Sequence, residues 1–419
     1  ADAVINFPET DGNIPEFLDI DRLVGLAREY KIDSLHPGYG YLSENAELAE
    51  RCRDNGIVFI GPSPEVIRLM GDKVAAKGIA AQSGVPMLGA SQGAVHTLDE
   101  ARKIAKRLGY PVIIKAVSGG GGRGMRIVHH QDELEQLYKI ATAEAQVAFN
   151  DPSVFNEKYL ENPKHIEFQI VADNYGNVVH LGERECSIQR KHQKLMEEAP
   201  SPALDERLRK KMAAAAVSLA KQAGYQSLGT VEFLLDHQKH FYFMEMNTRI
   251  QVEHGVTELV TGVDLVRQQL RIASGLALRL RQEDVTLQGH AIECRINAED
   301  PVQGFRPCPG RVDFLHFPGG PGVRVDSCLY SGCELSPYYD SMAAKILAYA
   351  PTRMETIRRM RRCLEEFTLE GFPTNAELSY QILYHPEFIL GECTTAFLDE
   401  HLSELLEFSR KLSESGVDA

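Results

Sequence analysis

The chain has 419 residues, 43% hydrophobic and 25% charged, which is ordinary globular composition and long enough for roughly two to three domains. Its formal net charge of −14 argues against nucleic-acid binding through the overall field, so any anion site has to be built locally. No stretch of about 18 consecutive apolar residues occurs, so we expect no membrane span. The eight cysteines are scattered and lack zinc spacing, which fits reduced thiols in a cytoplasmic protein.

The first 60 residues alternate between helical and strand-like patterns. Residues 17–30 have helical spacing, 32–40 indicate a strand and a turn, 44–56 a helix that ends at Gly56, and 57–61 a short buried strand. This alternation predicts an α/β domain over residues 1–60. Two short helices joined near Gly71 then predict a helical linker over residues 61–87.

Residues 88–160 predict a compact α+β region. Thr97, with Glu100 three residues later, is the signature of a capped helix. Strand-like segments on either side of a glycine-rich loop, an amphipathic helix and a further strand complete this region. Residues 161–402 predict a larger α+β region, and residues 403–419 a charged amphipathic helix at the periphery.

The glycine-rich loop is the run Gly119–Gly122 followed by Gly124. Backbone N–H groups of such a loop can close over an anion, although a flexible surface hairpin would have the same composition. Lys115 ends the preceding apolar strand and points toward the loop, which favours a phosphate ligand. The loop does not have the Walker pattern.

Two glutamates are predicted to face each other across a hairpin. If residues 237–240 form a four-residue loop, Glu232 pairs with Glu245. Directly opposed carboxylates repel unless a divalent cation lies between them, and Mg²⁺ suits oxygen ligands together with phosphate. The alternative is a solvated hairpin face that carries spare charge.

Polar and apolar residues alternate after this hairpin. The aromatic run 241–243 favours a strand at least to Met246, although i,i+4 pairs leave a helix open. On an extended chain one face carries Glu245, Asn247, Arg249, Gln251 and Glu253, and the other carries Met244, Met246, Ile250 and Val252.

Residues 184–198 concentrate positive charge in an otherwise acidic chain. A solvated basic loop would give the same pattern, but a binding partner should be a small anion, because the whole molecule repels polyanions. The cationic residues and their polar neighbours are Arg184, Gln189, Arg190, Lys191, His192 and Lys194. A lysine with a glycine loop, a carboxylate pair and a cationic loop together indicate phosphoryl chemistry on a nucleotide.

Four segments resemble the biotin carboxylases of the ATP-grasp superfamily: residues 36–45, 119–126, 184–198 and 247–254. The resemblance runs from residue 1 to about 402. It implies an N-terminal Rossmann-like domain, an ATP-grasp lid over 88–160, and an ATP-grasp core with a C-terminal biotin carboxylase domain over 161–402. The family's VLIANRGEIA-like start is missing, so we expect the first strand–helix unit to be absent. Gly255 stands where the family usually has proline.

By this resemblance the chain phosphorylates bicarbonate with ATP and Mg²⁺ or Mn²⁺, and the resulting carboxyphosphate supplies CO₂ to biotin. The expected reaction is the first half-reaction of an acyl-CoA carboxylase, such as acetyl-CoA carboxylase in fatty acid biosynthesis. No biotin-accepting MKM segment occurs, so biotin should arrive on a separate biotin carboxyl carrier protein. Carboxyltransferase subunits and a second copy in a homodimer are the other expected partners.

The resemblance also assigns residues to ligands. The nucleotide residues are Lys73, Lys115, Gly120, Gly121, Gly122, Met125, Glu157, Lys158, Leu160, His165, Gln189 and His192. The metal residues are Glu232, Glu245 and Asn247, and the bicarbonate residues are Lys194, Arg249, Gln251, Val252 and Glu253. Glu253 is the expected general base, and Arg249 and Lys194 the expected catalytic cations. Arg324 is expected to stabilise the biotin enolate, and Tyr39 to contact the biotin ring.

Three other readings stay open. The chain can be the biotin carboxylase subunit of a 2-oxoacid (pyruvate-type) carboxylase, because acceptor choice belongs to the carboxyltransferase. It can be another ATP-grasp ligase, against which residues 190–194 and 247–254 argue. It can also be catalytically silent and regulatory, although the retained Glu253, Arg249 and Lys194 argue against this.

Overall fold

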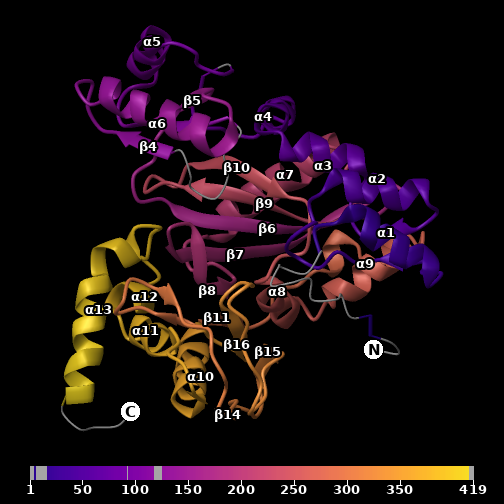
Figure 1. Cartoon of the computed structure of the whole chain (residues 1–419), viewed down its shortest axis with the longest axis vertical. Helices are drawn as coiled ribbons and strands as arrows, with labels where there is room; N and C mark the ends of the chain where they lie inside the picture. Colours follow the sequence, from indigo (N-terminus) through magenta and orange to yellow (C-terminus); the bar gives the residue numbers. More distant parts are fainter. Residues whose placement is uncertain (1–3, 6–16, 92, 118–124, 415–419) are drawn as a thin grey trace.

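The computed structural model describes residues 4–5, 17–91, 93–117 and 125–414. It confirms the predicted mixture of α/β and α+β regions (Figure 1). The helices and strands of the first part are α1 (Ile20–Glu29), β1 (Ser34–Leu35), α2 (Ala46–Asp54), β2 (Val58–Phe59), α3 (Pro64–Gly71) and α4 (Lys73–Gln82). β1 and β2 pair in parallel, as expected for an α/β unit.

A small three-stranded antiparallel sheet, in the order β4–β3–β5, stands apart from the main sheet (Figure 1). Its elements are α5 (Leu98–Leu108), β3 (Val112–Ala116), β4 (Met125–Val128), α6 (Leu134–Phe149) and β5 (Val154–Lys158). The predicted capping box is present: the Thr97 hydroxyl accepts from the Glu100 N–H at 3.2 Å, and the Glu100 carboxylate accepts from the Thr97 N–H.

The main body is one antiparallel sheet of eight strands, in the order β10–β9–β6–β7–β8–β11–β16–β15. Its strands are β6 (Lys164–Ala172), β7 (Val178–Arg190), β8 (Gln193–Ala199), β9 (Ser227–Leu235), β10 (Phe241–Asn247), β11 (His290–Asn297), β15 (Val323–Ser327) and β16 (Met342–Ala350). Two separate two-stranded sheets are also present: β12 (Glu299–Asp300) pairs with β13 (Arg306–Pro307), and β14 (Phe314–His316) pairs with β17 (Thr368–Glu370).

Helices cover the sheet at several places. They are α7 (Glu206–Gln222), α8 (His254–Thr261), α9 (Leu265–Ala273), α10 (Arg353–Glu366), α11 (Ala376–Ile382), α12 (Pro386–Leu390) and α13 (Phe397–Glu414). The helix predicted from Ser403 begins at Phe397, and Phe397, Leu398 and Leu405 are buried, so α13 is part of the C-terminal core. No helix in the described ranges is long and apolar enough to cross a membrane.

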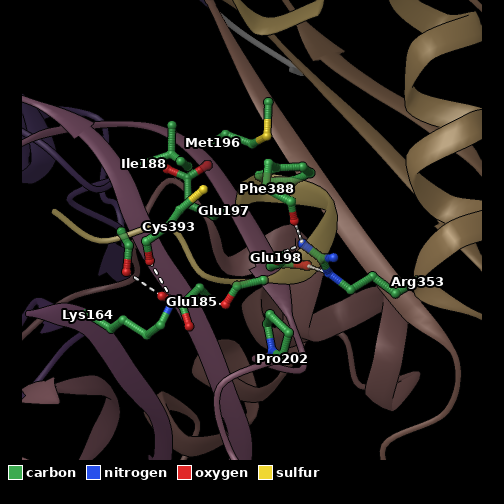
Figure 2. A pocket seen from close by; sticks show the side chains of 12 residues that line it. Lys164, Glu185, Ile188, Met196, Glu197, Glu198, Pro202, Arg353, Phe388 and Cys393 are labelled. Atoms are coloured by element: carbon green, nitrogen blue, oxygen red, sulfur yellow. Dashed lines mark hydrogen bonds and ion pairs between the residues drawn. The ribbon is translucent and has the colours of Figure 1, made fainter. Parts of the chain in front are cut away.

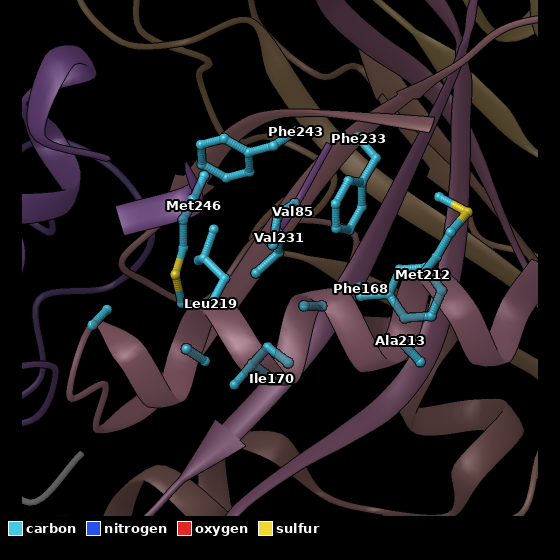
Figure 3. Close-up of a cluster of buried hydrophobic side chains, with 14 of the residues drawn as sticks. Val85, Phe168, Ile170, Met212, Ala213, Leu219, Val231, Phe233, Phe243 and Met246 are labelled. Carbon is cyan, nitrogen blue, oxygen red and sulfur yellow. The ribbon is translucent and has the colours of Figure 1, made fainter. Parts of the chain in front are cut away.

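Strand alternation separates the core from the polar face. On β6, Phe168 and Ile170 pack with α7 and with Phe233 of β9, and the Phe168 and Phe233 rings meet edge to face at 6.1 Å (Figure 3). Glu167 and Gln169, which alternate with them along the strand, belong to the opposite face. Both faces of β6 are buried, so that second face has to satisfy its charges internally.

Candidate active site

Glu232 on β9 and Glu245 on β10 are directly opposed, as predicted. The hairpin loop differs from the prediction. The Asp236 N–H donates to the His240 carbonyl at 2.9 Å, which leaves the three residues His237–Lys239 in the loop instead of four. Lys239 has a φ of 64°, the left-handed residue that commonly closes a three-residue hairpin loop.

A β-bulge restores the pairing of the two carboxylates. Phe243 pairs with Phe233, a register that would place Glu245 opposite Val231. The register shifts by one residue between Phe243 and Glu245, which brings Glu245 to Glu232. The bulge also allows Phe243 to be buried in the core and Glu245 to face the site, although both are odd-numbered. Met244, the extra residue, is 40% exposed.

Arg184 of β7 organises the floor of the site. Its side chain is fully buried, so the guanidinium has to be paired throughout. It donates to Glu167, Gln169, Thr257, Thr230 and Gln251. Because the Gln251 carbonyl oxygen is taken by Arg184 at 2.7 Å, its amide nitrogen turns to Glu232 at 2.9 Å.

Lys194 of β8 connects three carboxylates. Its Nζ donates to Glu167 at 2.6 Å, to Glu253 at 2.7 Å and to Glu232 at 3.0 Å. Burial alone would lower the pKa of Lys194, but these carboxylates raise it well above its ordinary value. Lys194 therefore stays charged, and it links the carboxylate pair of the hairpin to Glu253.

Glu253 lies between two cations. Its Oε1 accepts from Lys194, and its Oε2 accepts from Arg295 Nη2 at 3.0 Å. Arg295 is held in turn by Glu197, which accepts from its Nε at 2.7 Å. Burial opposes ionisation of Glu253, but Lys194, then Arg295 and Arg184, hold its pKa well below the usual range. Glu253 is thus an ionised carboxylate in a site from which water is largely excluded.

Two further acids lie behind Glu253 with raised pKa values. Burial raises the pKa of Glu197 to about 7 and that of Glu293 to about 8, against the opposing charges of Arg295 and Lys345. Lys345 Nζ lies 3.4 Å from Glu293 and also donates to the carbonyl of Val252. Within the described residues neither carboxylate oxygen of Glu293 has a hydrogen bond, which explains why burial dominates.

Arg249 is held by the N-terminal domain. Its Nε donates to Glu44 Oε2 at 3.0 Å, and its Nη2 donates to the carbonyl oxygen of the Asn247 side chain at 3.2 Å. The other Glu44 oxygen accepts from the N–H of Thr248 at 2.8 Å. Glu44 belongs to the segment 36–45 and therefore bridges the two most distinctive motifs of the sequence.

The carboxylate pair has the donor set of a divalent-cation site. Asn247 donates to Glu232 at 2.9 Å. The pKa of Glu232 lies well below its usual range, since Lys194 and His165 outweigh burial, whereas desolvation and Glu232 itself raise the pKa of Glu245. His165 Nε2 lies 2.9 Å from Glu232 outside hydrogen-bond geometry, so among the described residues this buried nitrogen has no hydrogen-bond partner. Oxygen donors of this kind fit Mg²⁺ or Mn²⁺.

A second group of cations faces the site from α4 and the small sheet. Lys115 Nζ donates to Glu157 at 2.5 Å, and Lys77 donates to the other oxygen of the same carboxylate. Burial opposes ionisation of Glu157, but these two ammonium groups lower its pKa. Lys73 begins α4, where partial desolvation and then Lys115 lower its pKa while Glu245 opposes the change. Glu157 thus holds Lys77 and Lys115 beside the site.

The turn between β7 and β8 is strained. Arg190 pairs with Gln193, and both loop residues have positive φ: 47° at Lys191 and 66° at His192. This is the backbone of a type I′ turn, which glycine and asparagine prefer. The two strained residues lie two and three positions before Lys194, and backbone outliers of this kind cluster at functional sites.

Several predicted residues have other contacts or lie elsewhere. The Lys158 ammonium donates to the carbonyls of Gly109 and Tyr110, so any nucleotide contact of this residue would use its main chain. Arg324 forms a bidentate pair with Asp326 at 2.9 Å and donates to Glu258 at 2.6 Å. Gly120, Gly121 and Gly122 lie outside the described residues.

The other predicted residues line the region without a decisive contact. Met125 begins β4 and pairs with Lys115, Leu160 lies two residues after the end of β5, and Gln189 is buried opposite Lys194. Tyr39 is 44% exposed in the loop that leads to Glu44.

Family comparisons agree with this arrangement. Residues 1–67 match the biotin carboxylase N-terminal domain, residues 72–281 the ATP-binding domain of the carbamoyl-phosphate synthase L chain, and residues 293–400 the biotin carboxylase C-terminal domain. The biotin carboxylase of Nostoc sp. is 55% identical over 384 residues, which are 92% of this chain and 86% of that protein. The chain belongs to the biotin carboxylase family.

Members of this family with different acceptors are similarly close. One of the pyruvate carboxylase subunits of Methanothermobacter thermautotrophicus is 50% identical over 92% of this chain and 78% of its own length. The biotin carboxylase domain dimer of Hydrogenobacter thermophilus 2-oxoglutarate carboxylase, solved with MgADP, ADP and bicarbonate, has a TM-score of 0.90 and 48% identity, and covers 94% of this chain and 87% of that one. The ATP-grasp fold and the ATP-dependent ligase class follow from this membership.

Sequence reasoning missed the residues that orient the others. Glu44 is inside a recognised motif, but nothing in one sequence shows that it reaches Arg249. Arg295 on β11 contacts Glu197 on β8, although the two residues are 98 positions apart in the chain. The only sequence signal was the buried-strand composition around Arg295, since a charged residue within such a strand needs a partner.

Proposed function

We propose that this chain catalyses the ATP-dependent carboxylation of biotin by bicarbonate, the first half-reaction of a biotin-dependent carboxylase. The observation that carries the proposal is the position of Glu253, ionised between Lys194 and Arg295 and linked through Lys194 to the Glu232–Glu245 pair. An ionised carboxylate, two cations and a carboxylate pair in one site support this proposal, because deprotonation and phosphorylation of a small oxyanion require such groups.

ATP binding is assigned to the residues between the small sheet and the main sheet. Lys73, Lys115, His165 and His192 supply cationic or polar groups, and Glu157 positions Lys115. A divalent cation on Glu232 and Glu245 would neutralise phosphate charge. Met125, Leu160 and Gln189 complete the assignment, and Gly120 to Gly122 stay proposed as the covering loop. Lys158 is proposed to contact the nucleotide only through its main chain.

Bicarbonate is assigned to Arg249, Gln251, Lys194 and the N–H of Val252, beside Glu253. Glu253 takes the bicarbonate proton on a carboxylate oxygen. Lys194 and Arg295 lower its basicity, but they also stabilise the negative charge that develops on the substrate, which is the larger effect in a dry site. Bicarbonate would bind Arg249 by replacing Glu44 at the guanidinium, or by sharing the guanidinium with Glu44.

Two arginines are assigned different tasks. Arg324 stays proposed as the cation for the biotin enolate, and its side chain is 34% exposed, so a ligand can reach it. Asp326 and Glu258 hold its guanidinium in place, and an enolate oxygen would share it with one of these carboxylates. Arg295 touches Glu253 directly, so it is proposed to position the base. Tyr39 stays proposed as a contact of the biotin ring.

The final acceptor is proposed to be an acyl-CoA, as in acetyl-CoA carboxylase and fatty acid biosynthesis. Relatives named biotin carboxylase reach 55% identity, and the pyruvate carboxylase relative reaches 50%. This small difference keeps the 2-oxoacid alternative. A biotin carboxyl carrier protein, carboxyltransferase subunits and a homodimer are the proposed partners.

The test is ATP hydrolysis measured with bicarbonate, with and without free biotin. Biotin-dependent ADP release that disappears in Glu253→Gln supports the proposal. Hydrolysis stimulated by another carboxylic acid and not by biotin would identify a different ligase. The absence of any nucleotide turnover in a folded, ATP-binding protein would favour a regulatory role.

A further inference from the structure

A cluster outside the active site joins α12 to α13, the yellow C-terminal helices of Figure 1. His385 caps the N-terminus of α12, and His401 and Glu404 lie one turn apart on α13. Each of the three offers one ligand atom, and these atoms lie within 4.8 Å of one another. The histidines are partly buried and Glu404 is exposed, so the cluster opens to solvent at one side.

The tautomer of His401 is fixed by a carboxylate. Its Nε2 lies 2.9 Å from Glu387 Oε1, and since an ionised carboxylate only accepts, Nε2 carries the proton. In the neutral ring Nδ1 is then a lone pair, and it faces the carboxylate of Glu404 at 3.7 Å. Two acceptors that face each other repel unless a proton on Nδ1, a metal ion or a water molecule lies between them.

The spacing suits a metal ion. Zinc bonds of about 2.0–2.2 Å to nitrogen and oxygen at a tetrahedral angle separate the two ligand atoms by roughly 3.4 Å. The observed 3.7 Å is close to this value and is long for a direct hydrogen bond. Glu387, which holds the opposite ring nitrogen, is the outer carboxylate that metal-binding histidines usually have.

The second imidazole completes the set. The His385 ring lies 4.4 Å from the His401 ring, centroid to centroid, and both rings pack on the fully buried Phe397. His385 Nδ1 accepts the N–H of Glu387 at a long 3.3 Å. Ligation by His385 replaces that weak bond, because a neutral imidazole has one lone pair.

The helix that carries His385 is firmly anchored. A small cavity of about 10 Å³ lies beneath it. Figure 2 shows Arg353 at this cavity, where it pairs with Glu198 and donates to the carbonyl of Phe388 at 2.7 Å. Lys164 donates to the carbonyls of Gly391 and Cys393. The cavity has room for about one water, so it is no ligand site itself. The contacts of Arg353 and Lys164 hold α12 and the residues after it against the main sheet.

We propose that His385, His401 and Glu404 bind one first-row transition-metal cation, with Zn²⁺ as the best match, which clamps α13 to α12. Imidazole nitrogens select such ions over Mg²⁺, which prefers oxygen ligands alone. The three protein ligands leave a fourth position for water. This site is independent of the Glu232–Glu245 pair in both location and ligand chemistry.

The experiment titrates the full, EDTA-treated chain with ZnCl₂ by calorimetry, in excess MgCl₂ so that the oxygen-ligand site is filled. One zinc equivalent is expected, with a rise in the thermal midpoint. Glu404→Gln and His401→Ala should each weaken zinc binding at least tenfold, and Glu387→Gln should weaken it about tenfold through the outer carboxylate. His237→Ala, which removes an exposed loop histidine, is the matched control and should bind as wild type.

CoCl₂ supplies a second readout, because tetrahedral Co²⁺ with nitrogen ligands absorbs in the visible range. Glu404 is 74% exposed on its side chain, so Glu404→Gln reports on ligation even if a histidine variant fails to fold. Zinc affinity that is the same in wild type, Glu404→Gln and His401→Ala overturns the proposal. So does a His401 ring that is doubly protonated at neutral pH and unaffected by zinc.

Discussion

Arg295 donates to Oε2 of Glu253 at 3.0 Å from a strand that also carries Glu293, while Lys194 holds the other oxygen of the same carboxylate. Glu253 therefore has one cation on each oxygen. We expect Arg295→Gln to lower kcat for biotin-dependent ADP release by about 100-fold or more, the usual cost of losing a charge-stabilising donor. Steady-state kinetics with saturating bicarbonate measure this, and a rate equal to that of the wild type would contradict the positioning role.

Substitution of Arg324 is expected to change the kinetics differently from substitution of Arg295. If Arg324 serves the biotin enolate alone, Arg324→Gln should lower biotin-dependent ADP release at least tenfold and leave the slow, biotin-independent hydrolysis of ATP with bicarbonate unchanged. Arg295→Gln should lower both rates, because it acts on the base. ADP release measured with and without biotin separates the two. Equal loss of both rates in Arg324→Gln would move Arg324 to the bicarbonate step.

Glu44 is expected to act on bicarbonate through Arg249. Glu44→Gln keeps the shape but weakens the charge-assisted bond to Arg249 Nε, so the guanidinium is held less firmly. We predict a rise of about tenfold in KM for bicarbonate with a smaller change in kcat. Steady-state kinetics at varied bicarbonate measure this. Glu47→Gln, on the exposed side of α2, is the control, and equal effects of the two changes would argue against a specific contact.

The carboxylate pair is expected to set the metal requirement. Glu245→Gln removes one of two opposed oxygen ligands, so the Mg²⁺ concentration for half-maximal activity should rise about tenfold or more, and EDTA should abolish turnover of the wild type. Activity titrated with MgCl₂ measures the shift. An unchanged midpoint in both Glu245→Gln and Glu232→Gln would place the metal elsewhere.

Glu293 makes stability depend on pH. Burial raises its pKa to about 8 from an ordinary 4.5, so the folded state binds more protons than the unfolded state between these values. Stability from this group is complete below pH 4.5 and is lost as the pH rises to about 8, by at most on the order of 5 kcal/mol. Thermal midpoints of wild type and Glu293→Gln from pH 5 to 9 test this. The variant should gain on the wild type as the pH rises, and parallel curves would contradict the shift.

The sequence predicted the local elements well, because their signals are local. The capping box at Thr97, the break between α3 and α4 near Gly71 and the opposition of Glu232 and Glu245 are all present. The predicted hairpin loop was one residue too long, and the bulge at Met244 restored the predicted pairing of Glu232 with Glu245. A bulge is set by how the strand packs on its neighbours, so a count of residues cannot reveal it.

The residues that orient the site could not be predicted. The Glu44–Arg249, Glu197–Arg295 and Lys345–Val252 contacts join segments far apart in the chain. Single-sequence patterns carry no information about such pairs. The surroundings of Arg324 were equally out of reach, because one of its two carboxylate partners, Glu258, is 66 positions away. Its role and the domain boundaries stay predictions.

The strand order of the main sheet has a consequence for how the molecule can move and break. β8 and β11 pair through Ala199 with Ala291 and Met196 with Cys294. The regions matched by the ATP-binding and C-terminal family domains therefore share one continuous hydrogen-bonded sheet. A single cut in the chain between residues 281 and 290 would leave two fragments that remain bound, each needing the other to cover its exposed edge. The small three-stranded sheet is not part of this larger sheet, so we expect any opening and closing of the site to involve the small sheet.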